Sequence, residues 1–288
     1  HCSVRRQRQM CIRDRGNLLD LDYDLPVASA QLKSSLILAG IRSKNGIKIK
    51  EKDTSRDHTE RLLSNMGADI NVDGLKITVK PSLIESRDII VPGDISSAAF
   101  WMVAGSIHND SEIMIRNVGI NETRAGIISV LNRMGASLEF SNKMDYSGEP
   151  ACDILVKSSN LKGTNISGKE IPLLIDEIPI IALAAVFAEG ETLITDAEEL
   201  RFKESDRISL TVNWMKDAGA KVEEFQDGMK ITGTNYLGGG TFSSHGDHRL
   251  AMTLGIASLI SQESITINDH EASNVSYPGF WENLNNLG

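Results

Sequence analysis

The chain has 288 residues, of which 41% are hydrophobic and 24% are charged, as is ordinary for a globular protein of one large or two moderate domains. The formal net charge of −9 argues against nucleic acid as the main partner, so an anionic substrate would need a local basic cluster. Three cysteines provide no disulfide framework, which indicates a reducing compartment. The longest apolar run, residues 178–188, is too short to span a bilayer.

Residues 1–15 differ from the rest of the chain. They contain five arginines, no apolar periodicity, no starting methionine and no apolar core of a signal peptide. We interpret them as a leader that is either non-native, as in a translated adapter sequence, or a disordered basic arm. The remainder begins in mid-fold, so we expect a fragment that lacks an N-terminal part.

Two kinds of helix are predicted in alternation. The first kind is apolar on nearly all sides and should be buried inside a domain. Its members are residues 28–41, 94–107, 176–189 and 247–261, each with Ser or Asp in its first two positions. The second kind is amphipathic and should lie on the surface. Its members are residues 57–66, 123–134, 205–218 and 278–287.

The first three amphipathic helices share a pattern at both ends. Each has an arginine at its start and a Gly-Ala pair just past its end, where glycine supplies the left-handed residue that stops a helix. The arginines are Arg56, Arg124 and Arg207, and the glycines are Gly67, Gly135 and Gly219.

Strand patterns complete an internal repeat of buried helix, strand, surface helix, strand, strand. The predicted strands are residues 47–51, 69–72, 75–79, 112–116, 137–140, 154–156, 192–196, 221–225, 229–232 and 264–268. The period of roughly 70 to 80 residues fits an α/β supersecondary unit rather than a solenoid. The stretch 83–91 is the best candidate for a hinge. We therefore predict the remainder of a first domain at residues 16–90 and a second domain at 91–288.

The charged stretch LRFKESDRI, residues 200–208, stands at the start of one amphipathic helix. Asp206 suits a first helical turn, whereas the cations Lys203 and Arg207 do not, since the open N–H groups there favour negative charge. Such cations indicate an anion held against the helix N-terminus. The alternative, a solvated cluster of salt bridges, fits this stretch equally well.

Seven stretches carry a resemblance to a known family: PVASAQLKSSLILAG (26–40), TSRDHTERLLSNMGAD (54–69), PGDISSAAF (92–100), ETRAGIISVLNRMGA (122–136), IDEIP (175–179), AEELRFKESDRIS (197–209) and GDHRLAM (246–252). Together they resemble the 5-enolpyruvylshikimate-3-phosphate synthases. The resemblance implies an α/β, two-domain enolpyruvyl transferase fold. Its repeated units have buried helices and four-stranded sheets, an inside-out α/β barrel that binds substrates in the cleft between the domains.

The resemblance also implies the reaction. The enolpyruvyl group of phosphoenolpyruvate passes to the 5-hydroxyl of shikimate 3-phosphate and phosphate is released, a step toward chorismate and the aromatic amino acids. The expected partners are these two small molecules, with no metal or organic cofactor, no nucleic acid and no membrane. A cytoplasmic monomer is expected. The family's lysine-serine phosphate motif and glycine-rich loop have no counterpart in this chain, so we expect the fragment to be inactive alone.

By resemblance, three residues are assigned to catalysis. Glu204 handles the proton at the methylene carbon with Lys203 beside it, and Asp176 is the base near the 5-hydroxyl. Arg207 and Arg249 bind phosphoenolpyruvate, because paired guanidinium groups suit carboxylate and phosphate oxygens.

The resemblance assigns the shikimate 3-phosphate site to residues Ser29, Ala30, Gln31, Arg56, Asp176 and Lys203. The first three would act at a helix N-terminus. Simple helix capping is the alternative for Ser29 and Asp176, and it is the favoured interpretation of Asp94. Arg124 is interpreted as structural, and His248 and Asp247 as residues that orient Arg249.

Two other functions stay open. The related UDP-N-acetylglucosamine enolpyruvyl transferase shares the repeat fold, although KESDR and SAQ favour the shikimate enzyme. A non-catalytic anion-binding repeat protein would also explain basic residues at helix starts.

Overall fold

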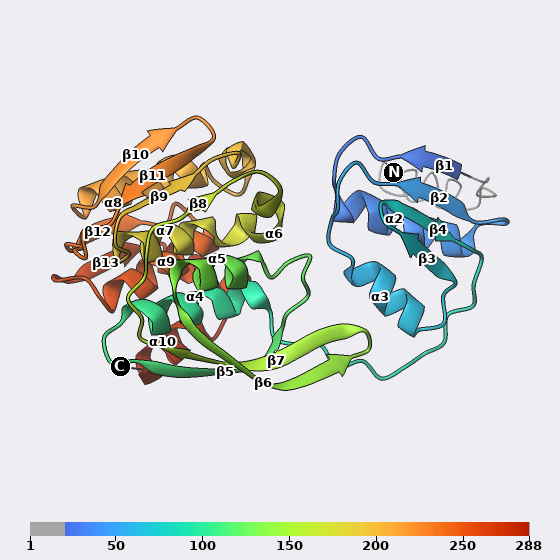
Figure 1. The fold of residues 1–288 in the computed structure, drawn as a ribbon, viewed down its shortest axis with the longest axis horizontal. Helices are drawn as coiled ribbons and strands as arrows, with labels where there is room; N and C mark the ends of the chain where they lie inside the picture. Colours follow the sequence, from blue (N-terminus) through green and yellow to red (C-terminus); the bar gives the residue numbers. More distant parts are fainter. Residues whose placement is uncertain (1–20, 288) are drawn as a thin grey trace, which may run out of the picture. The chain divides into compact units, whose positions relative to one another are not determined.

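The computed structural model describes residues 21–287, which fall into two compact units (Figure 1). The first unit extends to Val91 and includes Asp145–Glu149, and the second comprises Pro92–Met144 and the residues from Pro150 onward. The leader predicted at residues 1–15 lies outside the described residues. The domain limits placed at residues 90 and 91 stay a prediction.

From residue 21 onward, the described part of the first unit forms one four-stranded sheet with two helices. Its elements are β1 (Leu21–Asp24), α2 (Ala30–Arg42), β2 (Ile47–Lys50), α3 (His58–Asn65), β3 (Ile70–Asp73) and β4 (Lys76–Val79). The strand order is β1-β2-β4-β3, with β1 parallel to β2 and the other neighbours antiparallel.

The second unit contains three sheets. Its elements are α4 (Ile95–Ile107), β5 (Glu112–Gly119), α5 (Gly126–Met134), β6 (Ser137–Tyr146), β7 (Glu149–Lys157), β8 (Asn165–Ile166), α6 (Ile171–Leu174), α7 (Ile178–Val186), β9 (Glu191–Ile194), α8 (Arg207–Asp217), β10 (Lys221–Phe225), β11 (Gly228–Thr232), β12 (Gly240–Ser243), α9 (His248–Ser258), β13 (Ile265–Asn268) and α10 (Phe280–Leu287). Short 3-10 turns, η1 to η4, cover Gly168–Glu170, Ile175–Glu177, Glu198–Phe202 and His270–Val275. The sheet orders are β5-β7-β6, β10-β11-β9-β8 and β12-β13.

The predicted repeat is confirmed by the strand orders. The strand after a buried helix lies next to the last strand of its repeat, giving β2-β4-β3, β5-β7-β6 and β9-β11-β10. A further strand precedes the buried helix and pairs parallel with the strand after it: β1 with β2, β8 with β9, and β12 with β13. In the second repeat this strand is reduced to one parallel bridge, Gly93 to Val118. The leading strand was not predicted; β8, the shortest, has two residues and carries little hydrophobic pattern.

The helix-stopping glycines adopt the predicted conformation. The φ angles of Gly67, Gly135 and Gly219 are 93°, 91° and 83°, in the left-handed region where a side chain would be strained. The first three amphipathic helices therefore end where the Gly-Ala pattern placed their ends.

The core of the second unit is built from α4, α7 and α9, each packed against the other two with the sheets around them (Figure 1). Every residue of α7 is buried, as are most residues of α4 and α9. The prediction of buried helices is confirmed for these three.

The same prediction is wrong for α2. Only Lys33, Ile37, Gly40 and Ile41 of this helix are buried, and Leu38 is 52% exposed. Among the described residues, α2 packs against its own sheet and against α3, and no other apolar helix covers its remaining side. The apolar composition of α2 is therefore not enough to bury it.

Candidate functional site

The N-terminal ends of the buried helices of the second unit lie together. Asp94 caps α4 by accepting a hydrogen bond from the Ser97 N–H at 3.1 Å, so its capping interpretation is confirmed. Asp247 caps α9 in the same way, accepting from the N–H of Arg249 at 2.8 Å. Helix N-termini present open N–H groups and partial positive charge, which favour anions at this place.

Arg207 is the hub of the charged residues at these ends. It opens α8, is 1% exposed and contacts carboxylates from separate segments. Its Nε lies 2.9 Å from Asp247, its Nη2 lies 2.6 Å from Glu204, and its Nη1 lies 3.5 Å from Asp176. A buried guanidinium needs such partners to offset its lost hydration. The structure thus brings Asp176, which is distant in the sequence, to the neighbouring residues Glu204 and Arg207.

Asp247 links the two arginines that the resemblance assigned to one ligand. Its carboxylate accepts from Arg207 Nε, from the Ser205 hydroxyl at 2.8 Å and from the backbone of Arg249. Burial would raise the pKa of Asp247, but the hydrogen bonds from Arg207, Ser205 and the Arg249 backbone outweigh it and lower the pKa below its ordinary value. Asp247 therefore stays ionised and fixes Arg207 relative to the start of α9.

Arg249 points its side chain toward α7. It is 9% exposed, and its Nη1 lies 3.5 Å from the carboxylate of Glu177. The Nε of Arg249 is buried and has no hydrogen-bond partner within the described part of the chain. An unpaired buried donor is costly, so this edge of the guanidinium is suited to an incoming acceptor.

Lys203 and Glu204 lie in the bend before α8. Lys203 donates to Glu199 at 2.7 Å, and Glu204 keeps 55% of its side chain exposed. Asp176 is 17% exposed and lies within the 3-10 turn Ile175–Glu177 rather than at its N-cap, so the capping alternative for Asp176 is not what the structure shows. Burial, followed by the charge of Arg249, lowers the pKa of His248 and favours its neutral form.

The other assigned residues lie in the first unit. Ser29 is the N-cap of α2 and accepts from the Leu32 N–H at 3.3 Å, while Ala30 is partly buried and Gln31 is exposed. Arg56 is partly buried in the loop before α3.

Buried Lys33 connects these two segments of the first unit. It lies one turn after Ser29 and donates to the Ser55 carbonyl oxygen at 3.3 Å, next to Arg56. The charge on Lys33 is balanced by Glu51 at 3.2 Å and Glu60 at 2.7 Å. This network was not predicted, because its only signal in the sequence is a lysine within an apolar helix.

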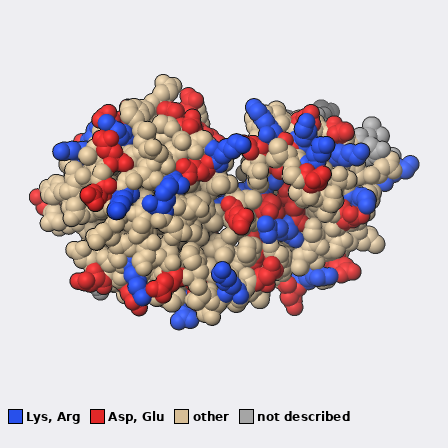
Figure 2. All heavy atoms as spheres, in the orientation of Figure 1, with Lys and Arg blue, Asp and Glu red and all other residues tan. Residues whose placement is uncertain are grey.

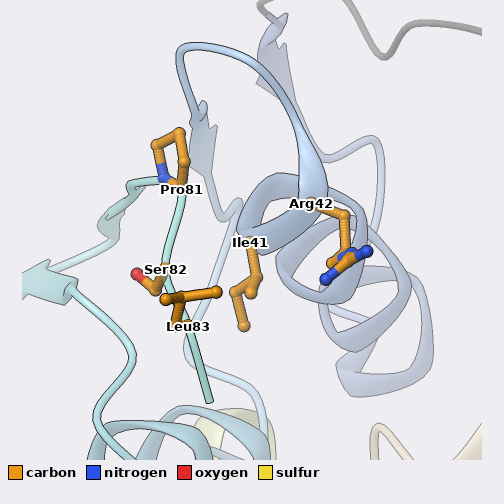
Figure 3. A pocket seen from close by; sticks show the side chains of 5 residues that line it. All are labelled: Ile41, Arg42, Pro81, Ser82 and Leu83. Atoms are coloured by element: carbon orange, nitrogen blue, oxygen red, sulfur yellow. The ribbon is translucent and has the colours of Figure 1, made fainter.

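A separate pocket in the first unit contains no assigned residue. It has a volume of about 300 Å³ and is lined by Ile41, Arg42, Pro81, Ser82 and Leu83 (Figure 3). On the face shown in Figure 2, acidic and basic side chains are interspersed, with no large patch of one sign. Among residues 21–287, no helix is long and apolar enough to cross a membrane, and no group of three or more His, Cys, Asp or Glu side chains could hold a metal ion.

Comparison with known proteins decides the family. The family model described as EPSP synthase (3-phosphoshikimate 1-carboxyvinyltransferase) matches residues 3–284. The chain belongs to the EPSP synthase family. Two similar relatives, both named 3-phosphoshikimate 1-carboxyvinyltransferase, come from Syntrophomonas wolfei (49% identical over 276 residues, 95% of this chain) and Bacillus subtilis (48% over 274 residues, 94% of this chain). The chain spans 64% of the length of each of these relatives.

Solved structures confirm the fold of this EPSP synthase family member. An EPSP synthase from Acinetobacter baumannii is 40% identical with a TM-score of 0.90, covering 94% of this chain and 63% of that one. The enolpyruvyl transferase NikO from Streptomyces tendae shares the fold at 18% identity, with a TM-score of 0.75 over 94% of this chain and 64% of that one. The predicted enolpyruvyl transferase fold and the resemblance on which it rested are therefore confirmed.

Proposed function

We propose that this protein is a 3-phosphoshikimate 1-carboxyvinyltransferase, which transfers the enolpyruvyl group of phosphoenolpyruvate to the 5-hydroxyl of shikimate 3-phosphate and releases phosphate. The observation that carries the proposal is the cluster around Arg207. Asp247 accepts from the guanidinium of Arg207 and from the backbone N–H of Arg249, an arginine of a different repeat, and the same Arg207 contacts Glu204 and Asp176. Cations for an anionic substrate thus stand beside two carboxylates available for proton transfer.

The two arginines are proposed to bind phosphoenolpyruvate. Its phosphate and carboxylate both suit the planar fork of a guanidinium. The unpartnered Nε of Arg249 supports this role, because a ligand oxygen there would satisfy a buried donor. Both side chains are nearly withdrawn from water, which strengthens their interaction with charge that develops during the reaction.

Two carboxylates are proposed to move protons. The new bond joins the 5-oxygen to the enol carbon, and the bond from that carbon to the phosphate oxygen breaks. Asp176 accepts the proton of the 5-hydroxyl and later returns it to solvent. Glu204, with Lys203 beside it, donates a proton to the methylene carbon as the new bond forms and takes one back as phosphate leaves. The exposure of Glu204, 55%, supports a group that can reach both ligand and solvent, whereas a purely structural partner of Arg207 would be buried as Asp247 is.

Shikimate 3-phosphate is proposed to bind Ser29, Ala30, Gln31 and Arg56 of the first unit together with Asp176 and Lys203. The open N–H groups of α2 follow Ser29 directly and suit a phosphate. The tie from Lys33 to the Ser55 carbonyl supports a fixed spacing between this helix start and Arg56. We also propose that the protein acts as a cytoplasmic monomer on these two small molecules, without a cofactor.

A coupled assay of phosphate release tests the proposed function. The expression clone carries the complete reading frame that contains residues 21–287, and each substrate is supplied alone and then both together. We expect phosphate only with both substrates, in equal amount to the enolpyruvyl product measured by mass spectrometry. Release that depends on phosphoenolpyruvate and UDP-N-acetylglucosamine instead, or no release with any acceptor, would reject the proposal.

A further inference from the structure

Glu177 is a buried carboxylate that the proposed reaction does not use. It lies directly after Asp176, is 2% exposed and receives hydrogen bonds from Ser96 of α4 and from Arg249 of α9. Burial raises the pKa of Glu177 above its ordinary value, while Arg249 and the Ser96 hydroxyl oppose the rise. A buried carboxylate destabilises the fold unless hydrogen bonds and opposite charges offset its lost hydration. The partners of Glu177 therefore decide whether it can be kept in this position.

The hydrogen bonds around Glu177 have a fixed direction. Arg124 donates from Nη2 to the Ser96 hydroxyl at 2.8 Å and also pairs with Asp94 at 3.0 Å. A guanidinium can only donate, and a serine hydroxyl has a single proton. Ser96 therefore accepts a hydrogen bond from Arg124 and donates one to Glu177, and the Oε1 of Glu177 accepts from Ser96 and from Arg249.

The repeat explains why an arginine stands at position 124. Arg124 and Arg207 occupy matching places, each at the start of an amphipathic helix. Arg207 joins the N-terminal end of α9, through Asp247, to Asp176 before α7. Arg124 joins the N-terminal end of α4 to Glu177, also before α7, through Ser96. The two arginines are thus repeat-related connections between successive buried helices.

We propose that Glu177 is a positioning residue for the reaction, held by Ser96 and Arg124, and that it orients the guanidinium of Arg249 toward phosphoenolpyruvate. This inference rests on the proposed function of Arg249. One Nη of Arg249 is anchored on Glu177, while its Nε has no partner among the described residues. Anchoring one side of the fork in advance removes side-chain freedom that ligand binding would otherwise have to restrict. The charge of Glu177 matters because charge-assisted hydrogen bonds are stronger than neutral ones.

Kinetics of Glu177→Gln in the active enzyme tests the inference, because glutamine keeps the shape and removes the charge. We expect the KM for phosphoenolpyruvate to rise about tenfold, as for loss of one charge-assisted hydrogen bond. The kcat and the KM for shikimate 3-phosphate should change by less than about twofold, whereas a merely structural role would change both KM values. In the Arg249→Lys background, Glu177→Gln should add little, because Glu177 acts through Arg249. Glu191→Gln, at an exposed site in the same unit, is the matched control.

A second measurement does not depend on activity. The Nε–H signal of Arg249 in the 15N spectrum of the 288-residue chain reports how firmly the guanidinium is held. We expect its order parameter to fall from the range of rigid groups, about 0.85, to below about 0.6 in Glu177→Gln. An Arg249 signal equally ordered in both proteins would overturn the inference, even if the wild-type enzyme transfers the enolpyruvyl group.

The remaining outcomes also decide the question. If the wild-type enzyme proves inactive, the proposed function fails and the Arg249 signal alone decides the positioning role.

If Glu177→Gln does not fold, Ser96→Ala takes its place, since it removes the link to Arg124 and leaves the carboxylate. We expect a rise of about threefold in the KM for phosphoenolpyruvate, smaller than that of Glu177→Gln because Ser96→Ala loosens Glu177 without removing its charge, and an unchanged KM would overturn the inference.

Discussion

The helix α2 of the first unit and the helix α7 of the second have similarly apolar sequences but different surroundings. All residues of α7 are buried, because α4 and α9 cover the sides that its own sheet leaves open. Among the described residues α2 has a sheet on one side and α3 on another, and Leu38 is 52% exposed. An apolar helix sequence therefore shows that a helix can be buried, while the number of repeat units packed around it decides whether it is.

The two units also differ in how they hold buried charge. In the first unit Lys33, Glu51 and Glu60 are all at least nine-tenths buried, and they mainly satisfy one another. In the second unit Arg207 is equally buried, but its partner Glu204 is 55% exposed. The first cluster should therefore act on stability, and the second on chemistry. The following predictions test this contrast.

The largest expected effect is on catalysis in the second unit. In the active enzyme, Glu204→Gln or Asp176→Asn should lower kcat by roughly 10²–10⁴, because each removes a proposed proton-transfer group. Steady-state phosphate release measures the loss, and circular dichroism should show an intact fold. Near-wild-type turnover in both variants would remove these carboxylates from the mechanism and leave them as partners of Arg207.

The next effect is on the stability of the first unit. Lys33→Met leaves Glu51 and Glu60 buried without their cation, so it should lower the free energy of unfolding of this unit by about 3–5 kcal/mol. All three tryptophans, Trp101, Trp214 and Trp281, belong to the second unit, so their fluorescence in urea reports that unit alone. Amide hydrogen exchange of α2 and β2 reports the first unit.

The expected result of Lys33→Met is faster exchange in the first unit at an unchanged tryptophan transition. Lys230→Met is the control, because Lys230 pairs with the exposed Glu223 at 2.7 Å and its loss should cost less than about 1 kcal/mol. If Lys33→Met and Lys230→Met had the same small effect on exchange, the cluster of the first unit would not be a stabilising element.

A smaller effect is expected when lysine replaces Arg207 or Arg249 of the second unit, because lysine keeps the positive charge but lacks the planar guanidinium group. Arg207→Lys and Arg249→Lys should each raise the KM for phosphoenolpyruvate about tenfold, since an ammonium group cannot bind two oxygens in a plane. The KM for shikimate 3-phosphate should change much less. Equal changes in both KM values, or a change only for shikimate 3-phosphate, would mean that the two arginines do not form a phosphoenolpyruvate site.

The sequence predicted local features better than it predicted contacts. Helical periodicity and the Gly-Ala pairs located α3, α5 and α8, because both signals lie within one element. The strand β8 was missed because two residues carry no usable pattern. The charges around Arg207 were predicted as a group only through the resemblance, since the Arg207–Asp247 pair spans 40 positions. The Ser96–Glu177 hydrogen bond spans 81 positions, and no local pattern indicates it.

The smallest effect should be a pH dependence confined to the first unit. Burial raises the pKa of Glu60 above its ordinary value, although the hydrogen bond and charge of Lys33 oppose the rise. The folded unit therefore binds the Glu60 proton more tightly than the unfolded chain does. The stability that this proton provides is fully present below the unfolded pKa of 4.5 and is lost as the pH rises through the higher folded pKa.

Glu60→Gln removes this dependence because glutamine does not titrate. Compared with the wild type, the variant should become relatively more stable as the pH rises from about 4 to 7. Hydrogen exchange of α2 and α3 at several pH values, corrected for intrinsic exchange rates, measures the difference. Lys33 and Glu51 face the same site and are present in both proteins, so their contributions largely cancel. A stability difference that is constant across this pH range would show that Glu60 is ionised in the folded unit as readily as in the unfolded chain.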